Sequence, residues 1–444
     1  MSTPPTLQEA IDKAGSPIKL LWKPDAKHWT VPVIAPEYAG WREEQAAWRD
    51  NVVIMDLSHH MSDTFIEGPD ATRLLTAVAA NDFENFEVGQ AKQIVPVTEE
   101  GFIVTDGILF REEENKYTLS GVPASQNWVK YHAKRGNYNV TCWTDTDSGL
   151  RKEGDPVLYR YQLQGPNALA LVEKIFGAPL PKMKFFHSKV VDLAGKKVRA
   201  FRHGMAGQAG YEFIGPYAEG AEIKKIFMDA GEAFGLVHVG GMAYYTNGIE
   251  SGWVPTPNPG IYTAPALEDY RKSLSAFSYE GQKPLHGSFF SEKIEDYYVS
   301  PYELGYGKMI AFNHDFIGRR VLEAKKNNIT RTKITLVGNT ADVEKLFGKE
   351  HGYILSYARY RIEYKGKLAG FTFYSGYIDP LKKLLALSLV ENEFATPGTE
   401  VEIVWGEHPG PGFESDIDLG LPRLRAIVAQ APYNDHAREV YRKG

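Results

Sequence analysis

The chain has 444 residues, which is room for two or three domains of ordinary size. Hydrophobic residues make up 43% of it and charged residues 24%, a composition that excludes a fully disordered protein. The 50 basic and 56 acidic side chains leave a net charge of −6. We therefore expect no nucleic-acid partner, because nucleic acids select basic surfaces.

Cysteine and histidine usage narrows the kinds of site that can exist. The only cysteine, Cys142, cannot form an intrachain disulfide or a cysteine-rich zinc site, and it fits a cytoplasmic protein. The 12 histidines show no metal-ligand spacing, so no metal is expected. No secretory signal and no apolar run of about 18 residues is visible, so we expect no membrane partner. The motifs of nucleotide hydrolases, dinucleotide-dependent enzymes and serine esterases are also missing.

The first predicted elements alternate between helix and strand. Residues 41–50 have the apolar spacing of a short amphipathic helix. Residues 62–67 predict a strand that ends at Gly68 and Pro69, and Asp70 is placed to cap the helix that follows. Further strands are predicted over residues 94–97, 102–110 and 116–121.

The same order of elements begins again near residue 158. There a strand leads to a Gly-Pro turn and a helix, and a hairpin and a second helix follow. The two blocks predict two related α/β subdomains, although their sequences show little similarity to each other.

The pattern changes toward the end of the chain. Residues 251–270 are rich in Gly, Pro and Tyr and predict a long irregular segment, of a kind that often carries function. Residues 331–444 contain short strand patterns, which predict a small, mostly antiparallel barrel. We therefore expect an α+β chain in which residues 1–325 hold the two subdomains and residues 326–444 form the barrel domain.

Two acidic residues stand in segments that otherwise favour burial. Glu212 lies inside an apolar strand pattern, and a buried carboxylate needs hydrogen-bond donors. Either a neighbouring arginine supplies them, or a ligand with two adjacent N–H groups does, such as a pterin or guanine edge. Asp106 precedes Gly107 in a second apolar stretch, where it predicts either a turn or an acidic group beside a ligand nitrogen.

A histidine pair and an aromatic cluster are the other candidates. His59 and His60 point to opposite faces of an extended segment, so they cannot readily hold one metal. One of them either lines a pocket or is a hydrogen-bonded structural residue. Tyr244, Tyr245 and Trp253 surround a Gly-rich segment, where they either belong to the core or bring a hydroxyl to a substrate oxygen.

The order of these motifs resembles that of the folate-binding aminomethyltransferase family, which includes the T-protein of the glycine cleavage system. The resemblance covers nearly the whole chain. It implies an aminomethyltransferase-type folate-binding fold of two related α/β subdomains plus a C-terminal antiparallel β-barrel domain. The matching segments are residues 57–75, 101–110, 163–169, 203–216, 248–252 and 313–323, with 398–406 in the barrel.

Within this family the chain is similar to the tetrahydrofolate-dependent aromatic O-demethylases, the vanillate and syringate enzymes of lignin catabolism. Tyr244 and Gly248 stand where the T-protein has arginines, and Gly121 stands where it has an asparagine, which argues against an aminomethyl-lipoyl substrate. The resemblance implies transfer of a methyl group from a methoxylated aromatic acid to N5 of tetrahydrofolate. The runs shared with the demethylases are residues 35–49, 91–98, 202–208, 250–263, 294–307 and 311–319.

The resemblance also implies the residues of the site. Tyr244 matches the catalytic tyrosine of the demethylases, and His60 is retained as a second catalytic and substrate-binding group. The implied contacts to tetrahydrofolate are Glu212 at the pterin edge, Trp253 packed on the folate, Asp106 near the reactive nitrogens, and Gln93, Gln162 and Tyr211.

The implied substrate pocket differs from that of the vanillate enzyme. Val31, Leu57 and Val122 stand where that enzyme has a tyrosine, a glutamine and an arginine, so a larger, less polar pocket that favours syringate is expected. His286 either binds the substrate carboxylate or is a surface histidine, and Trp29 is a further candidate contact. The alternatives are demethylation of vanillate, 3-O-methylgallate or a chlorinated methoxybenzoate, aminomethyl transfer, and folate binding without catalysis.

Overall fold

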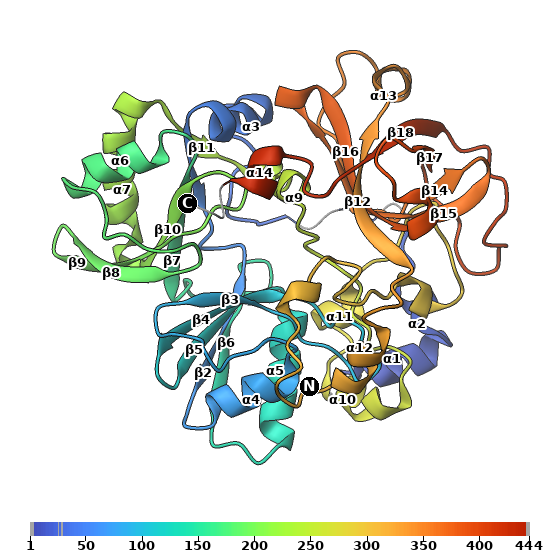
Figure 1. Ribbon diagram of the computed structural model, residues 1–444, viewed down its shortest axis with the longest axis horizontal. Coiled ribbons are helices and arrows are strands. Elements are labelled where there is room, and N and C mark those ends of the chain that lie inside the picture. The colour runs from blue at the N-terminus through green and yellow to red at the C-terminus, as the bar shows by residue number, and fades with distance from the viewer. Residues whose placement is uncertain (1–3, 25, 28–29, 441–444) are drawn as a thin grey trace.

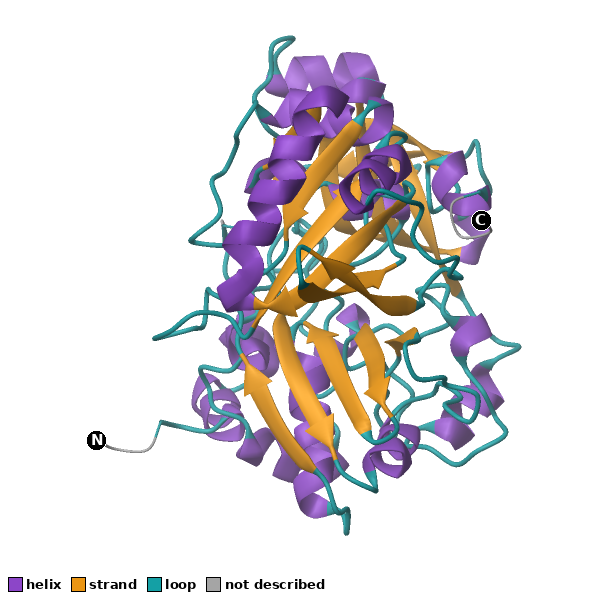
Figure 2. Cartoon of the chain, turned by 90° about the vertical axis from the view of Figure 1, so that its left-hand side faces the viewer, coloured by secondary structure: helices purple, strands orange, loops and turns teal. Residues whose placement is uncertain are grey.

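The computed structural model describes residues 4–24, 26–27 and 30–440. It contains three β-sheets, one at the left, one at the bottom and a barrel at the upper right of Figure 1. Figure 2, turned by 90°, shows the strands of two sheets in the middle of the molecule with helices around them. None of the helices within the described residues combines the length and apolar character that a membrane crossing requires.

The five-stranded sheet has the order β3-β4-β5-β2-β6, and all its neighbouring strands are antiparallel. Helices α4 (Ala71–Val78) and α5 (Pro123–Arg135) pack on it, and their apolar side chains share one buried cluster with Ile66 and Leu119 of the sheet. Its strands are β2 (Ser62–Glu67), β3 (Ala91–Ile94), β4 (Gly107–Glu113), β5 (Lys116–Gly121) and β6 (Thr141–Asp145).

The six-stranded sheet has the order β11-β1-β7-β10-β9-β8, and only β1 and β11 are parallel. Helices α6 (Ala168–Phe176) and α7 (Gly220–Gly231) pack on one face of it. Its strands are β1 (Val52–Asp56), β7 (Leu158–Gln164), β8 (Ser188–Leu193), β9 (Lys196–Phe201), β10 (Gly210–Pro216) and β11 (Leu236–Val239).

The two α/β units have the same plan. Each runs strand, helix, three antiparallel strands and helix, and the sheet orders β3-β4-β5-β2 and β8-β9-β10-β7 correspond. Both first strands end in a glycine with positive φ, +144° at Gly68 and +132° at Gly165. A Cβ there would lie 2.3 Å from the carbonyl oxygen of Asn139 or 2.4 Å from that of Asn51, so only glycine fits either turn. The predicted pair of related subdomains is confirmed.

The third sheet is the predicted antiparallel barrel. Its order is β15-β14-β17-β18-β12-β16, and pairing of β15 with β16 closes the ring; the short β13 (Leu355–Ser356) adds to β15. The 325/326 boundary falls at the end of α12 (Arg319–Lys325), and the domain division itself stays a prediction. The barrel elements are β12 (Arg331–Gly338), α13 (Thr340–Phe347), β14 (Arg361–Tyr364), β15 (Lys367–Ile378), β16 (Lys383–Glu391), β17 (Glu400–Val404) and β18 (Arg423–Ala429).

Several local predictions need adjustment. The strand expected over 102–110 begins only at Gly107, because the backbone N–H groups of Ile103 and Val104 bond to Val299 and Pro96 instead. Asp70 precedes α4 without capping it, since its carboxylate accepts hydrogen bonds from Arg73 and the Asn139 backbone. The remaining helices are α1 (Leu7–Ala14), α2 (Pro17–Leu21), α3 (Trp41–Asp50), α8 (Gly241–Tyr244), α9 (Asn247–Ser251), α10 (Glu268–Ser273), α11 (Tyr279–Gln282) and α14 (Asp435–Glu439).

Candidate active site

A cavity of about 550 Å³ lies between the two α/β sheets. Strand side chains alternate in direction, so each sheet turns one face to its own helices and the other to this cavity. The segments after β1, around α9 and before α12 complete the lining. Among the lining residues are Gln93, Phe110 and Ser120 of the five-stranded sheet, Arg160, Phe201 and Glu212 of the six-stranded sheet, and Leu57, Met205, Asn247, Trp253 and Lys308 of the connecting segments.

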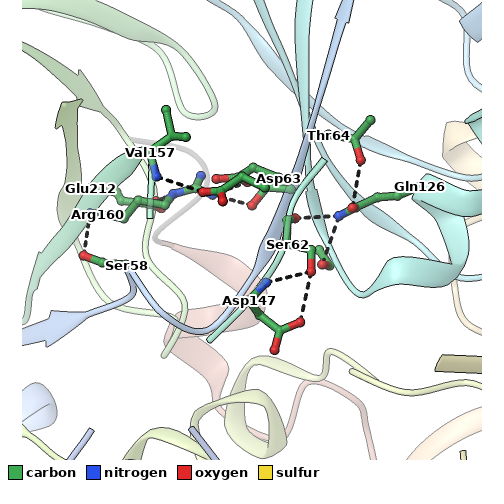
Figure 3. A network of polar contacts seen from close by, with 12 residues as sticks. Ser58, Ser62, Asp63, Thr64, Gln126, Asp147, Val157, Arg160 and Glu212 are labelled. Carbon is green, nitrogen blue, oxygen red and sulfur yellow. Dashed lines mark hydrogen bonds and ion pairs between the residues drawn. The ribbon is translucent and has the colours of Figure 1, made fainter. Parts of the chain in front are cut away.

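A buried ion network joins the two sheets at the wall of the cavity, which its members Ser120, Arg160 and Glu212 line (Figure 3). Arg160 of β7 donates from Nε to Oε1 of Glu212 at 2.7 Å and from Nη1 to Oδ1 of Asp63 at 3.0 Å. It also bonds the Ser120 hydroxyl. Glu212 is 4% exposed and Asp63 is 7% exposed, so two carboxylates share one guanidinium away from bulk water. The arginine partner that the sequence left open for Glu212 is present, and Glu212 also lines the cavity.

The charged groups of this network shift one another's pKa values. Burial raises the pKa of Asp63, while Arg160 opposes that rise. Burial works against the charge of Arg160, but the carboxylates of Glu212 and Asp63 raise its pKa overall. Arg160 therefore stays cationic and holds Glu212 in one orientation.

Asp106 forms a second polar centre in the cavity. Its Oδ2 accepts hydrogen bonds from Trp253 Nε1 at 2.8 Å, from the Tyr306 hydroxyl at 3.2 Å and from the Gln93 amide. Asp106 is 4% exposed, and burial raises its pKa although the bonds from Trp253 and Gln93 oppose the rise. The turn interpretation is thus insufficient, because this carboxyl holds together three segments that are distant in the sequence.

His60 and Tyr244 form a buried ring pair; neither lines the cavity itself, but His60 lies between Leu57 and Met61, which do. Their ring centroids are 4.1 Å apart with an interplanar angle of 57°. Neither ring nitrogen of His60 has a hydrogen-bond partner within the described residues. Burial lowers the pKa of His60 to about 3, so this imidazole is neutral near pH 7. Burial raises the pKa of Tyr244, and Glu212 and Arg160 are both close enough to act on it.

The residues predicted to bind the substrate differ in their position relative to the cavity and this ring pair. Leu57 lines the cavity, and Val31 belongs to the same buried cluster as Leu57 and Tyr244. Val122 directly precedes α5 and is half-buried, next to Gly121 of the cavity lining. Trp29 lies outside the described residues.

Gln162 is fully buried in the sheet that forms the cavity wall. Its Oε1 accepts a hydrogen bond from the Met205 backbone at 3.4 Å. Its Nε2 has no partner among the described residues, and Gln162 pairs with Glu212 in the sheet, but it is not itself one of the residues that line the cavity.

The positions of two residues do not fit the ligand contacts predicted for them. Tyr211 neighbours Glu212 in β10 and therefore points to the opposite face, into the cluster with α6 and α7. His286 pairs through Nδ1 with Oε1 of Glu407 at 2.9 Å and does not line the cavity. Neither the folate role of Tyr211 nor the carboxylate role of His286 has support from the structure.

The sequence analysis missed several lining residues. Arg160 carried a usable signal, since a lone charge in an apolar strand is the pattern that singled out Glu212. Phe185, Phe186 and Lys308 carried none, because they come from loops that reach the cavity only in the folded chain. Among the described residues no three His, Cys, Asp or Glu side chains gather as a metal site.

Comparisons with known proteins identify the family of this chain. A family model, the GCVT N-terminal domain, matches residues 24–257. A syringate O-demethylase of Sphingobium sp. (strain NBRC 103272 / SYK-6) is 37% identical over 450 aligned positions, which cover 98% of this chain and 97% of the relative. The chain belongs to the GCVT aminomethyltransferase family. The recognised family, the tetrahydrofolate cofactor and the enzyme class, a tetrahydrofolate-dependent methyltransferase, are confirmed.

Other members of the family match over similar lengths. A sesamin methylene transferase of Sinomonas sp. (strain No.22) is 28% identical, with 90% of each chain covered. The crystal structure of glycine cleavage system aminomethyltransferase T from Bartonella henselae matches with a TM-score of 0.64 at 17% identity, over 96% of each chain. That match confirms the predicted aminomethyltransferase-type fold.

The buried state of His60 predicts a pH dependence of stability. Its pKa is about 3 in the folded chain and near 6.5 when unfolded, so the unfolded chain binds more protons between these values. The contribution of His60 to stability is therefore complete above about pH 6.5 and is lost as the pH falls toward 3. We expect His60→Gln to flatten the slope of unfolding free energy against pH by up to about 1.4 kcal/mol per unit in this window. Urea titrations at pH 5 and pH 7 measure it, and an unchanged slope would contradict the placement of His60.

Proposed function

We propose that this enzyme demethylates a methoxylated aromatic acid and transfers the methyl group to N5 of tetrahydrofolate, giving the phenol and 5-methyltetrahydrofolate. The observation that carries the proposal is the buried pair of Tyr244 and His60, whose rings meet at 4.1 Å beside the cavity that Glu212 and Asp106 line. A neutral imidazole and a protonated phenol at one end suit an aryl ether better than a cationic amine.

Glu212, Asp106, Trp253 and Gln93 are the residues that would hold tetrahydrofolate. When bound, tetrahydrofolate supplies the secondary amine that accepts the methyl group. Arg160 holds one oxygen of Glu212, so the carboxylate presents its other oxygen to a ligand with paired N–H groups. Holding the acceptor and the ether in line in one cavity contributes up to about 7–11 kcal/mol to lowering the barrier in favourable cases.

The chain's own residues then act on the leaving oxygen. Burial raises the pKa of Tyr244, so its hydroxyl stays protonated and can donate a hydrogen bond to the phenolate that forms as the O–CH3 bond breaks. The neutral imidazole of His60, packed against the Tyr244 ring, would orient the phenol or bond to the same oxygen. The proton that the acceptor amine loses ends on the phenol, directly or through Tyr244 or Asp106. Burial raises the pKa of Asp106, and its side-chain donors all bind Oδ2, which leaves Oδ1 to hold that proton.

We further propose syringate as the substrate. Val31 and Leu57 are apolar and share a buried cluster with Tyr244. Val122 follows Gly121, which pairs with Ser62, two residues after His60. A ring with a second methoxy group would therefore have apolar neighbours there. The identity to a syringate O-demethylase supports the same choice.

A substrate panel tests this proposal. Purified protein and tetrahydrofolate are incubated without oxygen with syringate, vanillate, 3-O-methylgallate or a chlorinated methoxybenzoate, and kcat/KM is measured from phenol and 5-methyltetrahydrofolate. We expect the two products in equal amounts and the highest kcat/KM with syringate. Preference for vanillate would contradict the pocket argument. Turnover of an aminomethyl carrier protein with ammonia release, and of no methoxyarene, would contradict the reaction.

A further inference from the structure

The helix that carries Tyr244 is a single turn. α8 consists of Gly241–Tyr244, and a helix of this length makes too few internal hydrogen bonds to be stable on its own. Groups outside α8 therefore set its position. At its start, the backbone N–H of Gly241 donates to the carbonyl of Ala35 at 2.9 Å, and the N–H of the preceding residue donates to the buried carboxylate of Glu44.

The other end of α8 is held by two tyrosine hydroxyls from far along the chain. Carbonyl groups at the end of a helix lack partners inside it and need them elsewhere. Tyr353, just before β13, donates to the Met242 carbonyl at 2.7 Å. Tyr374 of β15 donates to the carbonyl of Tyr245. The donors follow their acceptors by 111 and 129 residues, so the barrel sheet and the segment before it hold the backbone on both sides of Tyr244.

The surroundings of Tyr374 keep its hydroxyl in place. Tyr374 is 2% exposed, and its ring stacks on that of Tyr357 with the centroids 4.9 Å apart and an interplanar angle of 3°. Burial raises the pKa of Tyr374, so the hydroxyl stays protonated and can donate. Tyr244 is close enough to act on the same pKa.

Gly248 makes room for this ring. A Cβ at residue 248 would lie 3.3 Å from Cε1 of Tyr374, so a larger side chain would have to push the ring aside. Gly248 is also one of the two positions at which the T-protein has an arginine. An arginine could not share this space with the Tyr374 ring, so the glycine and the tyrosine belong to one arrangement.

We propose that Tyr374 and Tyr353 are positioning residues, whose hydroxyls fix the backbone around Tyr244 and thereby the distance from the Tyr244 hydroxyl to the leaving oxygen. Neither residue lines the cavity, so both act through Tyr244. The inference rests on the proposed function, in which Tyr244 donates to that oxygen. Donors to a developing oxyanion act over a narrow range of about 2.7–3.1 Å, so a small displacement of α8 is costly.

A double-mutant cycle tests the proposal. Single-turnover rates of methyl transfer from syringate to tetrahydrofolate are measured for the wild type, Tyr374→Phe, Tyr244→Phe and the double variant. We expect Tyr374→Phe to slow transfer about tenfold when Tyr244 is present. In the Tyr244→Phe background the same change should slow transfer less than about twofold, because the hydroxyl to be positioned is gone. Dissociation constants of both ligands should change less than about twofold.

Two further variants support the cycle. Tyr353→Phe removes the hydroxyl on the other side of Tyr244 and should show the same dependence on it, so the cycle can be run with this variant if Tyr374→Phe does not fold. Tyr377→Phe is the matched control, since Tyr377 is a buried tyrosine of the same strand whose ring packs on His351. It should leave the rate of methyl transfer unchanged.

Equal slowing by Tyr374→Phe in both backgrounds would mean that this hydroxyl acts on the fold in general and not through Tyr244, and would overturn the proposal. An unchanged rate in the presence of Tyr244 would overturn it as well. These outcomes differ from a failure of the proposed function. If the wild type transferred no methyl group from any methoxyarene, the demethylation and the positioning role would both be overturned, whereas rapid transfer by both the wild type and Tyr374→Phe would overturn the positioning role alone.

Discussion

Replacing Tyr244 by phenylalanine is expected to lower kcat by about 10²–10⁴-fold with the methoxyarene substrate. The substitution keeps the ring that packs at 4.1 Å on His60 and removes only the hydroxyl. Without that hydroxyl the phenolate leaves into a buried site that has lost its protonated donor. The measurement is single-turnover kinetics with enzyme in excess, which separates methyl transfer from product release.

Binding experiments serve as the control for this variant. Tetrahydrofolate affinity should change less than about twofold, because the removed hydroxyl acts on the leaving oxygen and binds no part of the folate. Tyr38→Phe, at an exposed tyrosine, should leave both kcat and affinity unchanged. If Tyr244→Phe turned over at the wild-type rate, the tyrosine would have no part in catalysis, and another group would have to donate to the leaving oxygen.

Replacing Arg160 by methionine is expected to destabilise the fold by about 3–5 kcal/mol. Arg160 is the shared partner of Glu212 and Asp63, and its removal leaves two buried carboxylates without their cation. Urea unfolding of the wild type and of Arg160→Met at the same pH measures the loss of unfolding free energy. Arg160→Lys should recover part of the loss, because an ammonium keeps the charge without the planar guanidinium that reaches both carboxylates.

A compensating variant distinguishes loss of charge balance from loss of packing. Asp63→Asn combined with Arg160→Met and Glu212→Gln removes every charge of the network, so most of the lost stability should return. Folate affinity should stay low in that triple variant because the carboxylate at residue 212 is gone. A destabilisation by Arg160→Met below about 1 kcal/mol would mean that the network is solvated and would contradict its role as a bridge between the sheets.

Residues of the site that lie in or beside an apolar strand pattern could be found from the sequence. Glu212 and Asp106 stood out because a carboxylate in an apolar strand pattern must find donors, and both have them in the structure. The predicted folate contact of Tyr211 is not supported, because adjacent strand residues face opposite sides of a sheet and Tyr211 is next to Glu212. The same alternation predicts that Arg160 faces the same side as Glu212, as it does in the structure.

The remaining residues depend on how distant segments meet. Phe186 reaches the cavity because its segment is bonded to β3, about a hundred residues earlier in the chain, and no local pattern encodes that pairing. His286 lies between two runs that resemble the demethylases, residues 250–263 and 294–307, but folding brings it to Glu407 in the last part of the chain. The fold itself could be predicted from the sequence, because the repeated Gly-Pro turn after β2 and β7 and the strand-rich C-terminal part are both local features.

Transfer of an isotopically labelled methyl group tests the central claim most directly. Syringate carrying trideuteromethyl ethers is incubated anaerobically with the protein and tetrahydrofolate, and the products are analysed by mass spectrometry. The account predicts 5-(trideuteromethyl)tetrahydrofolate and the corresponding phenol in equal amounts, with all three deuterium atoms retained because the methyl group moves intact. Formation of the phenol without labelled folate, or loss of deuterium from the transferred carbon, would contradict direct methyl transfer between the two ligands of this cavity.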